Sequence, residues 1–271
     1  MQTWYWEDWN GLPYLRCSLL DAWPHGFFCQ QWWPRNPVDL VEVLDSTATV
    51  YRLKQIHSNQ VLSTAETHAV QEALGVQMPE HQRPLDEGDG LFTTRPQQSV
   101  WVSTADCTPV LVGDAKTGQT AAIHAGWRGT ASRIVPRIIE RMQAQGSHLS
   151  HLRIALGPAI GGEVYQVETG VAVTVGRSLL GAAQADNTGT GSDAEVLQWL
   201  QSLPDAPVFG DSQPDRARLD VRRVNLLQLA ELGIQREQVS VAPHCTYQEP
   251  QNFFSYRRTG EKKVQWSGIV S

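Results

Sequence analysis

The sequence predicts a mixed α/β (α+β) protein. It is expected to form one domain over residues 1–271. Segments with strand-like alternation and segments with helical spacing interleave along the whole length, and no change in composition divides the chain. With 271 residues, 41% of them hydrophobic, the chain is long enough to bury a large core. Residues 183–193 form the low-complexity stretch of the sequence, which predicts a flexible surface insertion.

The N-terminal part of the chain predicts strands and a short helix. Residues 1–50 alternate apolar and turn residues, as short strands with irregular connections do. Residues 40–51 combine acidic and β-branched positions, which indicates a short helix that runs into a strand. Alternation over residues 50–57 then predicts a strand with His57 near its end.

Three further strands are predicted around two candidate site residues. The β-like runs 100–104 and 110–112 flank Cys107. Pro109 lacks a backbone donor, so Cys107 is expected at a strand end or a bulge. Residues 120–125 predict the third strand, which contains His124 and stops at Gly126.

The C-terminal half predicts helices separated by strands. Apolar residues at helical spacing over 131–142 predict a helix that starts or kinks near Pro136. Residues 164–180 and 219–232 also predict helices, and Gly233 suits the position after the second one. The remaining predicted strands are residues 152–156 and 239–242.

Charge, hydropathy and cysteine use exclude several classes of protein. The chain has 22 basic and 28 acidic residues, a net charge of −6, and no basic run that would indicate a nucleic-acid partner. No apolar stretch is long enough to span a bilayer, and the first residues lack the pattern of a signal peptide. Four dispersed cysteines fit free thiols in a reducing compartment. We expect a cytoplasmic protein without a nucleic-acid or membrane partner, either a monomer or a small homo-oligomer.

His57, Cys107 and His124 each lie in a segment whose neighbours suit chemistry. The segments read Lys-Gln-Ile-His57-Ser, Ala-Asp106-Cys107-Thr-Pro and Ile-His124-Ala-Gly-Trp-Arg128-Gly. Two imidazoles and one thiolate make a three-ligand zinc set with an open fourth position, which is typical of catalytic rather than structural zinc. Each residue alone is more often a buried core residue than a metal ligand, so the prediction depends on their joint context.

Other polar residues near these segments are candidate catalytic or binding groups. Asp89 lies between two glycines and is predicted as a catalytic carboxylate or, with equal weight, as a turn residue. Asp106 is a second candidate acid/base or a partner for Arg128. Arg128 suits phosphate because of its planar guanidinium, while Lys54 and Gln55 are further candidates for contacts to phosphate or substrate.

Six motifs in a fixed order resemble a known family. They are Leu-Lys-Gln-Ile-His57, Gly-Asp89-Gly-Leu, Thr-Ala-Asp106-Cys107-Thr-Pro-Val-Leu, Ile-His124-Ala-Gly-Trp-Arg128-Gly-Thr-Ala, Gly157-Pro-Ala-Ile-Gly and Phe253-Phe-Ser-Tyr-Arg-Arg. Together they resemble the laccase-domain family, also named the polyphenol oxidase family and associated with purine nucleoside phosphorylase activity. The resemblance implies metal ligands at His57, Cys107 and His124, and mixed sheets flanked by helices in α/β/β/α layers.

The resemblance implies a zinc-dependent purine nucleoside enzyme. The expected reactions are phosphorolysis of adenosine, inosine, guanosine and methylthioadenosine, together with deamination of adenosine, so the partners are purine nucleosides and phosphate. A copper-dependent polyphenol oxidase is the first alternative. A multicopper site needs roughly ten histidines, largely in His-x-His pairs, whereas this chain has eight and no such pair. The second alternative is a metal-free cysteine hydrolase with Cys107 as nucleophile and His124 as base.

Overall fold

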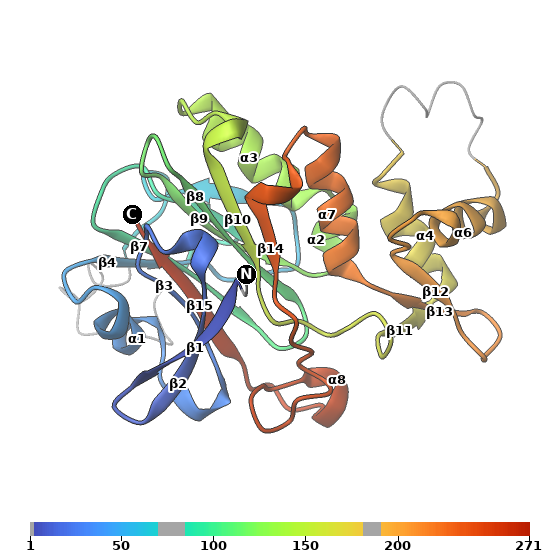
Figure 1. Ribbon diagram of the computed structural model, residues 1–271, viewed down its shortest axis with the longest axis horizontal. Coiled ribbons are helices and arrows are strands. Elements are labelled where there is room, and N and C mark those ends of the chain that lie inside the picture. Colours follow the sequence, from blue (N-terminus) through green and yellow to red (C-terminus); the bar gives the residue numbers. More distant parts are fainter. Residues whose placement is uncertain (1–2, 70–84, 181–190) are drawn as a thin grey trace.

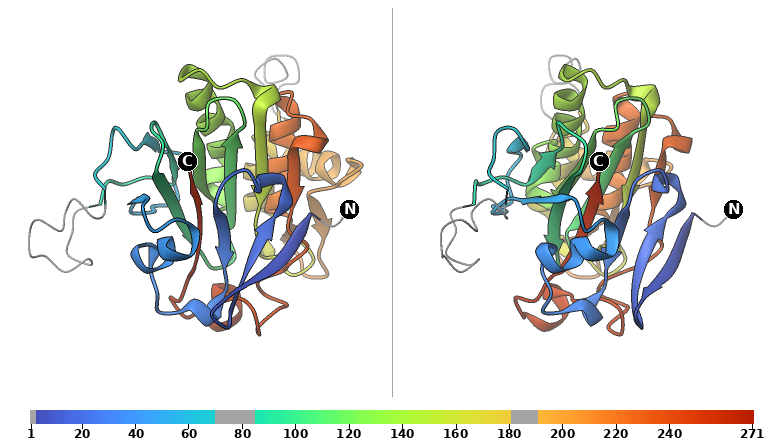
Figure 2. Two further views of the ribbon diagram at one scale, coloured as in Figure 1. Left: turned by 60° about the vertical axis from the view of Figure 1, so that its left-hand side comes forward. Right: turned by 90° about the vertical axis from the view of Figure 1, so that its left-hand side faces the viewer.

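Two six-stranded mixed sheets lie face to face in the computed structural model, which describes residues 3–69, 85–180 and 191–271 (Figures 1 and 2). The first sheet has the order β1-β2-β3-β15-β7-β4, and the second has the order β14-β10-β8-β9-β6-β5. A third sheet, β11-β13-β12, lies in a lobe at one end of the molecule (Figure 1). Strands and helices alternate along the chain, which confirms the predicted α/β class.

The first sheet consists of β1 (Trp4–Trp9), β2 (Leu12–Cys17), β3 (His25–Phe28), β15 (Gln265–Val270), β7 (Gln98–Thr104) and β4 (Thr49–Arg52). The second consists of β14 (Val239–Val241), β10 (Leu152–Leu156), β8 (Thr108–Asp114), β9 (Thr120–Ala125), β6 (Gly90–Phe92) and β5 (Val61–Ser63). The lobe contains β11 (Gln166–Glu168), β13 (Arg216–Leu219) and β12 (Val208–Gly210). The helices are α1 (Pro37–Leu44), α2 (Trp127–Ala131), α3 (Ile134–Ala144), α4 (Thr169–Arg177), α6 (Asp193–Ser202), α7 (Val221–Glu231) and α8 (Tyr256–Thr259).

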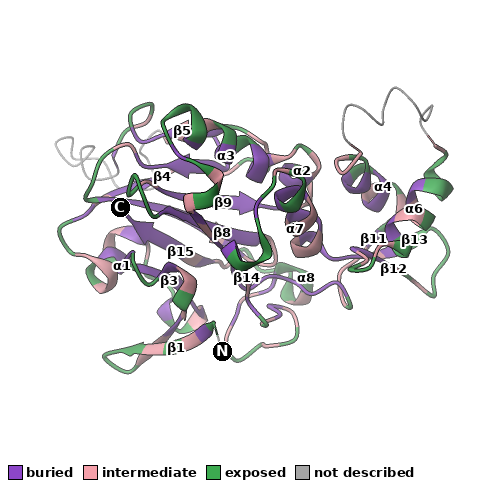
Figure 3. Ribbon diagram, turned by 45° about the horizontal axis from the view of Figure 1, so that its top comes forward, coloured by how far each residue is buried: buried purple, intermediate pink, exposed green. Residues whose placement is uncertain are grey.

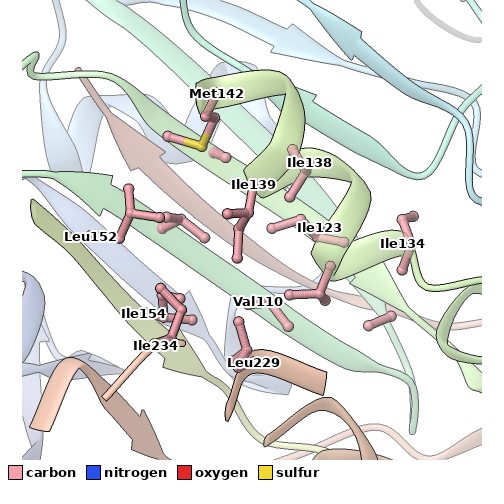
Figure 4. Close-up of a cluster of buried hydrophobic side chains, with 14 of the residues drawn as sticks. Val110, Ile123, Ile134, Ile138, Ile139, Met142, Leu152, Ile154, Leu229 and Ile234 are labelled. Atoms are coloured by element: carbon pink, nitrogen blue, oxygen red, sulfur yellow. The ribbon is translucent and has the colours of Figure 1, made fainter. Parts of the chain in front are cut away.

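Three hydrophobic clusters define the layers of the body. Between the sheets, side chains such as Phe27, Val100 and Leu111 pack together. On the outer face of the second sheet, α3 and α7 bury a cluster that includes Ile138 and Leu229 (Figure 4). Helix α1 covers the outer face of the first sheet with another cluster. Because an amphipathic helix must bury its apolar stripe against a sheet, this arrangement gives the expected α/β/β/α layers.

The central strands are buried on both faces, which explains their continuous apolar sequences. Every residue of β8 and β9 is buried, and most of β7 is buried as well (Figure 3). Strand β9 matches the predicted range 120–125. Helix α3 starts two residues before Pro136, where the ring removes no helical hydrogen bond. Helix α7 ends at Glu231 with Leu232 as its C-cap, and Gly233 follows with a φ of 91°, as expected for a residue after a helix.

Several predicted boundaries differ from the structure. Strand β4 ends at Arg52, so His57 lies in a turn beyond it. The helix predicted from residue 164 starts only at Thr169, because residues 166–168 pair with β13 across the lobe. Most of the predicted insertion at 183–193 lies outside the described residues, but Ser192 caps α6, whose first residue is Asp193.

The lobe has a hydrophobic core of its own. Its core residues come from α4, α6 and the third sheet, and Val221 and Val224 of α7 belong to the same cluster. Trp127 and Ala131 of α2 pack against it. Helices α2 and α7 therefore connect the lobe to the body. No helix in the described ranges combines the length and apolar composition needed to cross a membrane.

Candidate metal centre

His57, Cys107 and His124 come together at one point of the body. One candidate ligand atom from each residue lies within 4.8 Å of those of the other two. The rings of His57 and His124 have centroids 4.7 Å apart and are nearly perpendicular. Strands β8 and β9 place two of the residues: Thr108 pairs with Ala125 and Pro109 with His124, so Cys107, just before β8, lies opposite Gly126 and diagonally across from His124 in β9. The structure thus brings together the three residues predicted to hold a metal.

Cys107 lies where the chain crosses from one sheet to the other. Strand β7 belongs to the first sheet and β8 to the second, and residues 105–107 connect them. Asp106 has a φ of 93°, which is unfavourable for a residue with a side chain. Its carboxylate accepts hydrogen bonds from the Thr246 hydroxyl at 2.7 Å and from the Arg257 amide at 2.7 Å. These bonds hold the strained turn that presents Cys107.

Gly126 lets the sulfur of Cys107 approach the end of β9. A Cβ atom built on Gly126 would lie 2.9 Å from Cys107 Sγ and 3.5 Å from His57 Cδ2. Carbon and sulfur do not approach so closely without a bond, so any side chain at this position would push the thiol aside. The glycine in the His-Ala-Gly-Trp motif therefore has a direct steric role at the cluster.

Asp89 orients both histidines from behind the cluster. Its side chain is fully buried, and its Oδ1 lies 2.8 Å from His124 Nδ1. The same carboxylate accepts from the backbone amides of Ile56, His57 and Ser58 at 2.7–3.2 Å and from the Ser58 hydroxyl at 2.9 Å. His57 has a φ of 59°, and these bonds hold its turn in that conformation.

The charges at the cluster favour a thiolate beside an imidazolium when no metal is present. Burial alone would raise the pKa of Cys107, but His124 and His57 outweigh it and lower the pKa to about 6. Burial would lower the pKa of His124, but the Cys107 thiolate and Asp89 raise it to about 9. The thiol is thus deprotonated near neutral pH, which is the form in which a cysteine binds metal.

The donor set fits a divalent transition metal with an open coordination position. Thiolate and imidazole are the ligand types that zinc takes, and three protein ligands are typical of a catalytic site. The bond from Asp89 to Nδ1 leaves His124 Nε2 for the cluster, and ligating histidines commonly have such a carboxylate partner. Solvent exposure increases across the three candidate ligands: His124 is buried, Cys107 is partly buried and His57 is exposed. A bound ion would therefore be reachable from solvent.

Two cavities meet at Cys107. The larger, of about 280 Å³, is lined by Gln55, His57, Ser103, Thr104, Ala105, Cys107, His124, Tyr256, Glu261, Lys262, Lys263 and Val264. The smaller lies on the side of α2 and is lined by Asp106, Cys107, Ala125, Gly126, Trp127, Ile160, Tyr165 and Val221. A molecule in either cavity would contact the thiol.

The other predicted site residues lie at different places around these cavities. Gln55 lines the larger one, and its amide group makes three hydrogen bonds with Ser103. Asp106 lines the smaller one. Arg128 is exposed and stacks on Trp127, with its Cζ atom 4.4 Å from the ring centroid. Lys54 points away to Glu87 at 2.8 Å and lines neither cavity.

Sequence reasoning missed several residues that line the cavities. Tyr256, Lys262 and Lys263 come from α8 and the segment after it, and Tyr165 precedes the lobe. The Phe-Phe-Ser-Tyr-Arg-Arg motif was a signal for the first group, and its last residues form the start of α8, which is capped by Ser255. The local sequence around Tyr165 gives no comparable signal.

Known proteins resemble this chain in sequence and in structure. A protein of Synechocystis sp. named purine nucleoside phosphorylase is 49% identical over 99% of this chain and 97% of its own length. A protein named adenosine deaminase, from an unknown prokaryotic organism, is 26% identical over 82% of this chain and 79% of its own length. The crystal structure of YlmD from Geobacillus stearothermophilus superposes with a TM-score of 0.74 at 22% identity, covering 98% of each chain, and shares the fold.

The sequence profile of one family matches most of the chain. It spans residues 34–270, which include all three candidate ligands, Asp89 and both cavities. The chain therefore belongs to the family described as multi-copper polyphenol oxidoreductase laccase.

Proposed function

We propose that this chain is a zinc-dependent purine nucleoside enzyme. It would cleave adenosine, inosine, guanosine and methylthioadenosine by phosphorolysis and would also deaminate adenosine. The observation that carries this proposal is the convergence of His57, Cys107 and His124 within 4.8 Å at the junction of two cavities. Relatives named purine nucleoside phosphorylase and adenosine deaminase support an enzyme that processes nucleosides.

The three ligands suit both the metal and the deamination. A zinc ion with an open position lowers the pKa of its water to about 7 and so supplies a nucleophile at neutral pH. Asp89 fixes the tautomer of His124 and shapes the His57 turn, which makes it a positioning residue. Asp106 borders the smaller cavity next to Cys107 and is the candidate acid/base group that can face a substrate.

Phosphorolysis requires a site for phosphate as well as one for the nucleoside. A phosphate oxygen forms a bond to C1′ of the ribose while the bond from C1′ to the purine nitrogen breaks, and the purine leaves with a proton. Arg128 is our candidate for phosphate because its guanidinium is exposed, stacks on Trp127 in the wall of the smaller cavity and makes no ion pair among the described residues. Gln55 would contribute to the wall of the larger cavity, which has the volume of a nucleoside-sized ligand.

A metal-free cysteine hydrolase is the second candidate function. The low pKa of Cys107 and the raised pKa of His124 describe a thiolate–imidazolium pair, and Asp89 orients the imidazole as the third member of a catalytic triad does. In this alternative Cys107 attacks the substrate directly. Such an enzyme would keep its activity after chelation and lose it on alkylation.

A copper-dependent phenol oxidase has less support. Within the described residues, His57, Cys107 and His124 form the one group of three or more His, Cys, Asp or Glu side chains that could hold a metal ion. A multicopper oxidase needs several such groups, rich in histidine. The family description alone favours this alternative.

Metal analysis combined with product analysis tests the proposed function. The purified protein should contain about one zinc per chain. With adenosine and phosphate it should release adenine and ribose-1-phosphate, whereas without phosphate it should form inosine. Full activity in metal-free protein would favour the cysteine hydrolase, and four coppers with phenol oxidation would favour the oxidase.

A further inference from the structure

The smaller cavity has two arginines beside its aromatic walls. Trp127 and Tyr165 line this cavity. Arg128 stacks on Trp127 at 4.4 Å, and Arg257 stacks on Tyr165 at 4.9 Å, measured from Cζ to the ring centroid. The two arginines are separated by almost half the chain, so only the fold brings them to one site. A planar guanidinium fixed on a ring keeps its remaining N–H donors available for an anion.

Arg257 and its neighbour Arg258 have different roles. Arg258 donates to the backbone carbonyls of Thr246, Tyr247 and Phe253 at 2.6–2.9 Å, so its side chain is used to hold the local chain together. Arg257 donates from one guanidinium nitrogen to the carbonyl of Gln166 at 2.6 Å. Its other nitrogens have no partner among the described residues. Arg257 is thus anchored and still has donors to offer.

The acidic group at this cavity does not neutralise Arg257 through a side-chain ion pair. Asp106 uses one carboxylate oxygen for the Thr246 hydroxyl and the other for the backbone amide of Arg257. Neither Arg128 nor Arg257 forms an ion pair within the described residues. Two guanidinium groups therefore lie beside a cavity whose wall carries one carboxylate, Asp106, and the Cys107 thiolate, which is paired with the His124 imidazolium.

Tyr165 adds a neutral donor to the wall of this cavity. Burial and the nearby Cys107 thiolate raise the pKa of its phenol to about 12, although Arg257 and Arg128 act in the opposite direction. Cys107, Arg257 and Arg128 are thus all close enough to the Tyr165 phenol for their charges to change its pKa. Because the phenol stays protonated at neutral pH, it can donate a hydrogen bond to an oxyanion.

We propose that Arg257 is the second phosphate-binding cation of the site and that it acts with Arg128 and Tyr165 in the smaller cavity. The larger cavity would then hold the nucleoside, so the two substrates would reach the cluster through different cavities that share Cys107. This inference rests on the proposed function for the identity of the anion. The competing cations are Lys262 and Lys263, which line the larger cavity.

Titration of inorganic phosphate into the zinc-loaded protein, followed by calorimetry, tests this site without turnover. Arg257→Gln should weaken phosphate binding by roughly 10- to 100-fold, as expected when one charge-assisted hydrogen-bonding group is removed. Tyr165→Phe keeps the ring under Arg257 and should weaken binding by a smaller factor. Arg137→Gln, an exposed position on α3, is the matched control and should bind as the wild type does. Zinc content and melting temperature show whether each variant is folded.

The outcomes separate this inference from the proposed function. Wild-type protein that binds phosphate, and loses it in Arg257→Gln, supports the site even if no ribose-1-phosphate is formed. Phosphorolysis with an unchanged phosphate KM in Arg257→Gln would overturn the inference and leave the proposed function standing. Loss of phosphate binding in Lys262→Gln or Lys263→Gln, with Arg257→Gln unaffected, would overturn it as well, as would absence of phosphate binding to the wild type.

Discussion

The substitution Asp89→Asn removes a charge at a buried position and changes little else. Oδ1 of Asp89 accepts from the His57 amide at 3.0 Å and contacts His124 Nδ1 at 2.8 Å. Oδ2 accepts from the amides of Ile56 and Ser58 and from the Ser58 hydroxyl. In the wild type, the Asp89 carboxylate serves all of these groups as a hydrogen-bond acceptor and donates no hydrogen bond. The NH₂ group of asparagine must therefore face one of the two sets of donors.

The hydrogen bonds determine which orientation is less costly. On the Oδ2 side the NH₂ would leave two backbone amides without an acceptor, whereas on the Oδ1 side it would leave only the His57 amide. An unsatisfied buried amide costs about 1–3 kcal/mol, so we expect the Oδ1 side and a loss of stability of that size. The NH₂ then donates to His124 Nδ1, which puts the imidazole proton on Nε2, the atom needed for the metal.

Zinc affinity is the direct readout of this tautomer change. Loss of a carboxylate partner behind a ligating histidine commonly weakens metal binding by about 10- to 100-fold. We expect an increase of this size in the dissociation constant of zinc, measured by competition with a chromogenic chelator at neutral pH. Asp45→Asn is the control, because this aspartate accepts bonds in a turn from Thr47 through one oxygen that asparagine retains. Wild-type zinc affinity and stability in Asp89→Asn would refute the reasoning.

Three further predictions concern other features of the site and the core. Gly126→Ala should reduce zinc affinity although no ligand is removed, because its Cβ would lie 2.9 Å from Cys107 Sγ; unchanged metal content after dialysis would contradict this steric role. In metal-free protein, alkylation of Cys107 by iodoacetamide should show a midpoint near pH 6, whereas Cys29, whose pKa burial raises to about 11, should stay unreactive; a midpoint above pH 8 for Cys107 would disprove the thiolate–imidazolium pair. Burial lowers the pKa of His25 to about 4, so its neutral form is favoured in the folded state, and the stability from this group is present above pH 6.5 and lost as the pH falls towards 4. Urea unfolding at pH 7 and pH 5 should show a loss of about 2 kcal/mol that is absent in His25→Asn.

Local patterns in the sequence predicted the elements whose neighbours are close along the chain. The strands β8 and β9 and the helices α3 and α7 have apolar patterns set by burial against adjacent elements, and they lie where expected. The three candidate ligands were also found from their segments, because histidine and cysteine next to Gly, Pro and Asp are unusual in a plain core. These features depend on the residues themselves or on short-range packing.

Features that depend on distant partners could not be predicted in the same way. Residues 166–168 form a strand only because β13, some fifty residues later, provides hydrogen bonds, and the local pattern favoured a helix. The role of Asp89 depends on amides from residues 56–58, which are brought to it by the parallel pairing of β5 with β6. Arg257 stacks on Tyr165 only in the folded chain.

X-ray absorption at the zinc edge of the purified protein tests the central claim most directly. If His57, Cys107 and His124 hold one catalytic zinc, the spectrum should show one sulfur ligand at about 2.3 Å and two imidazole nitrogens at about 2.0 Å, with one further light atom. Cys107→Ser should remove the sulfur signal. A zinc environment without sulfur, or with the sulfur signal unchanged in Cys107→Ser, would contradict the proposed centre.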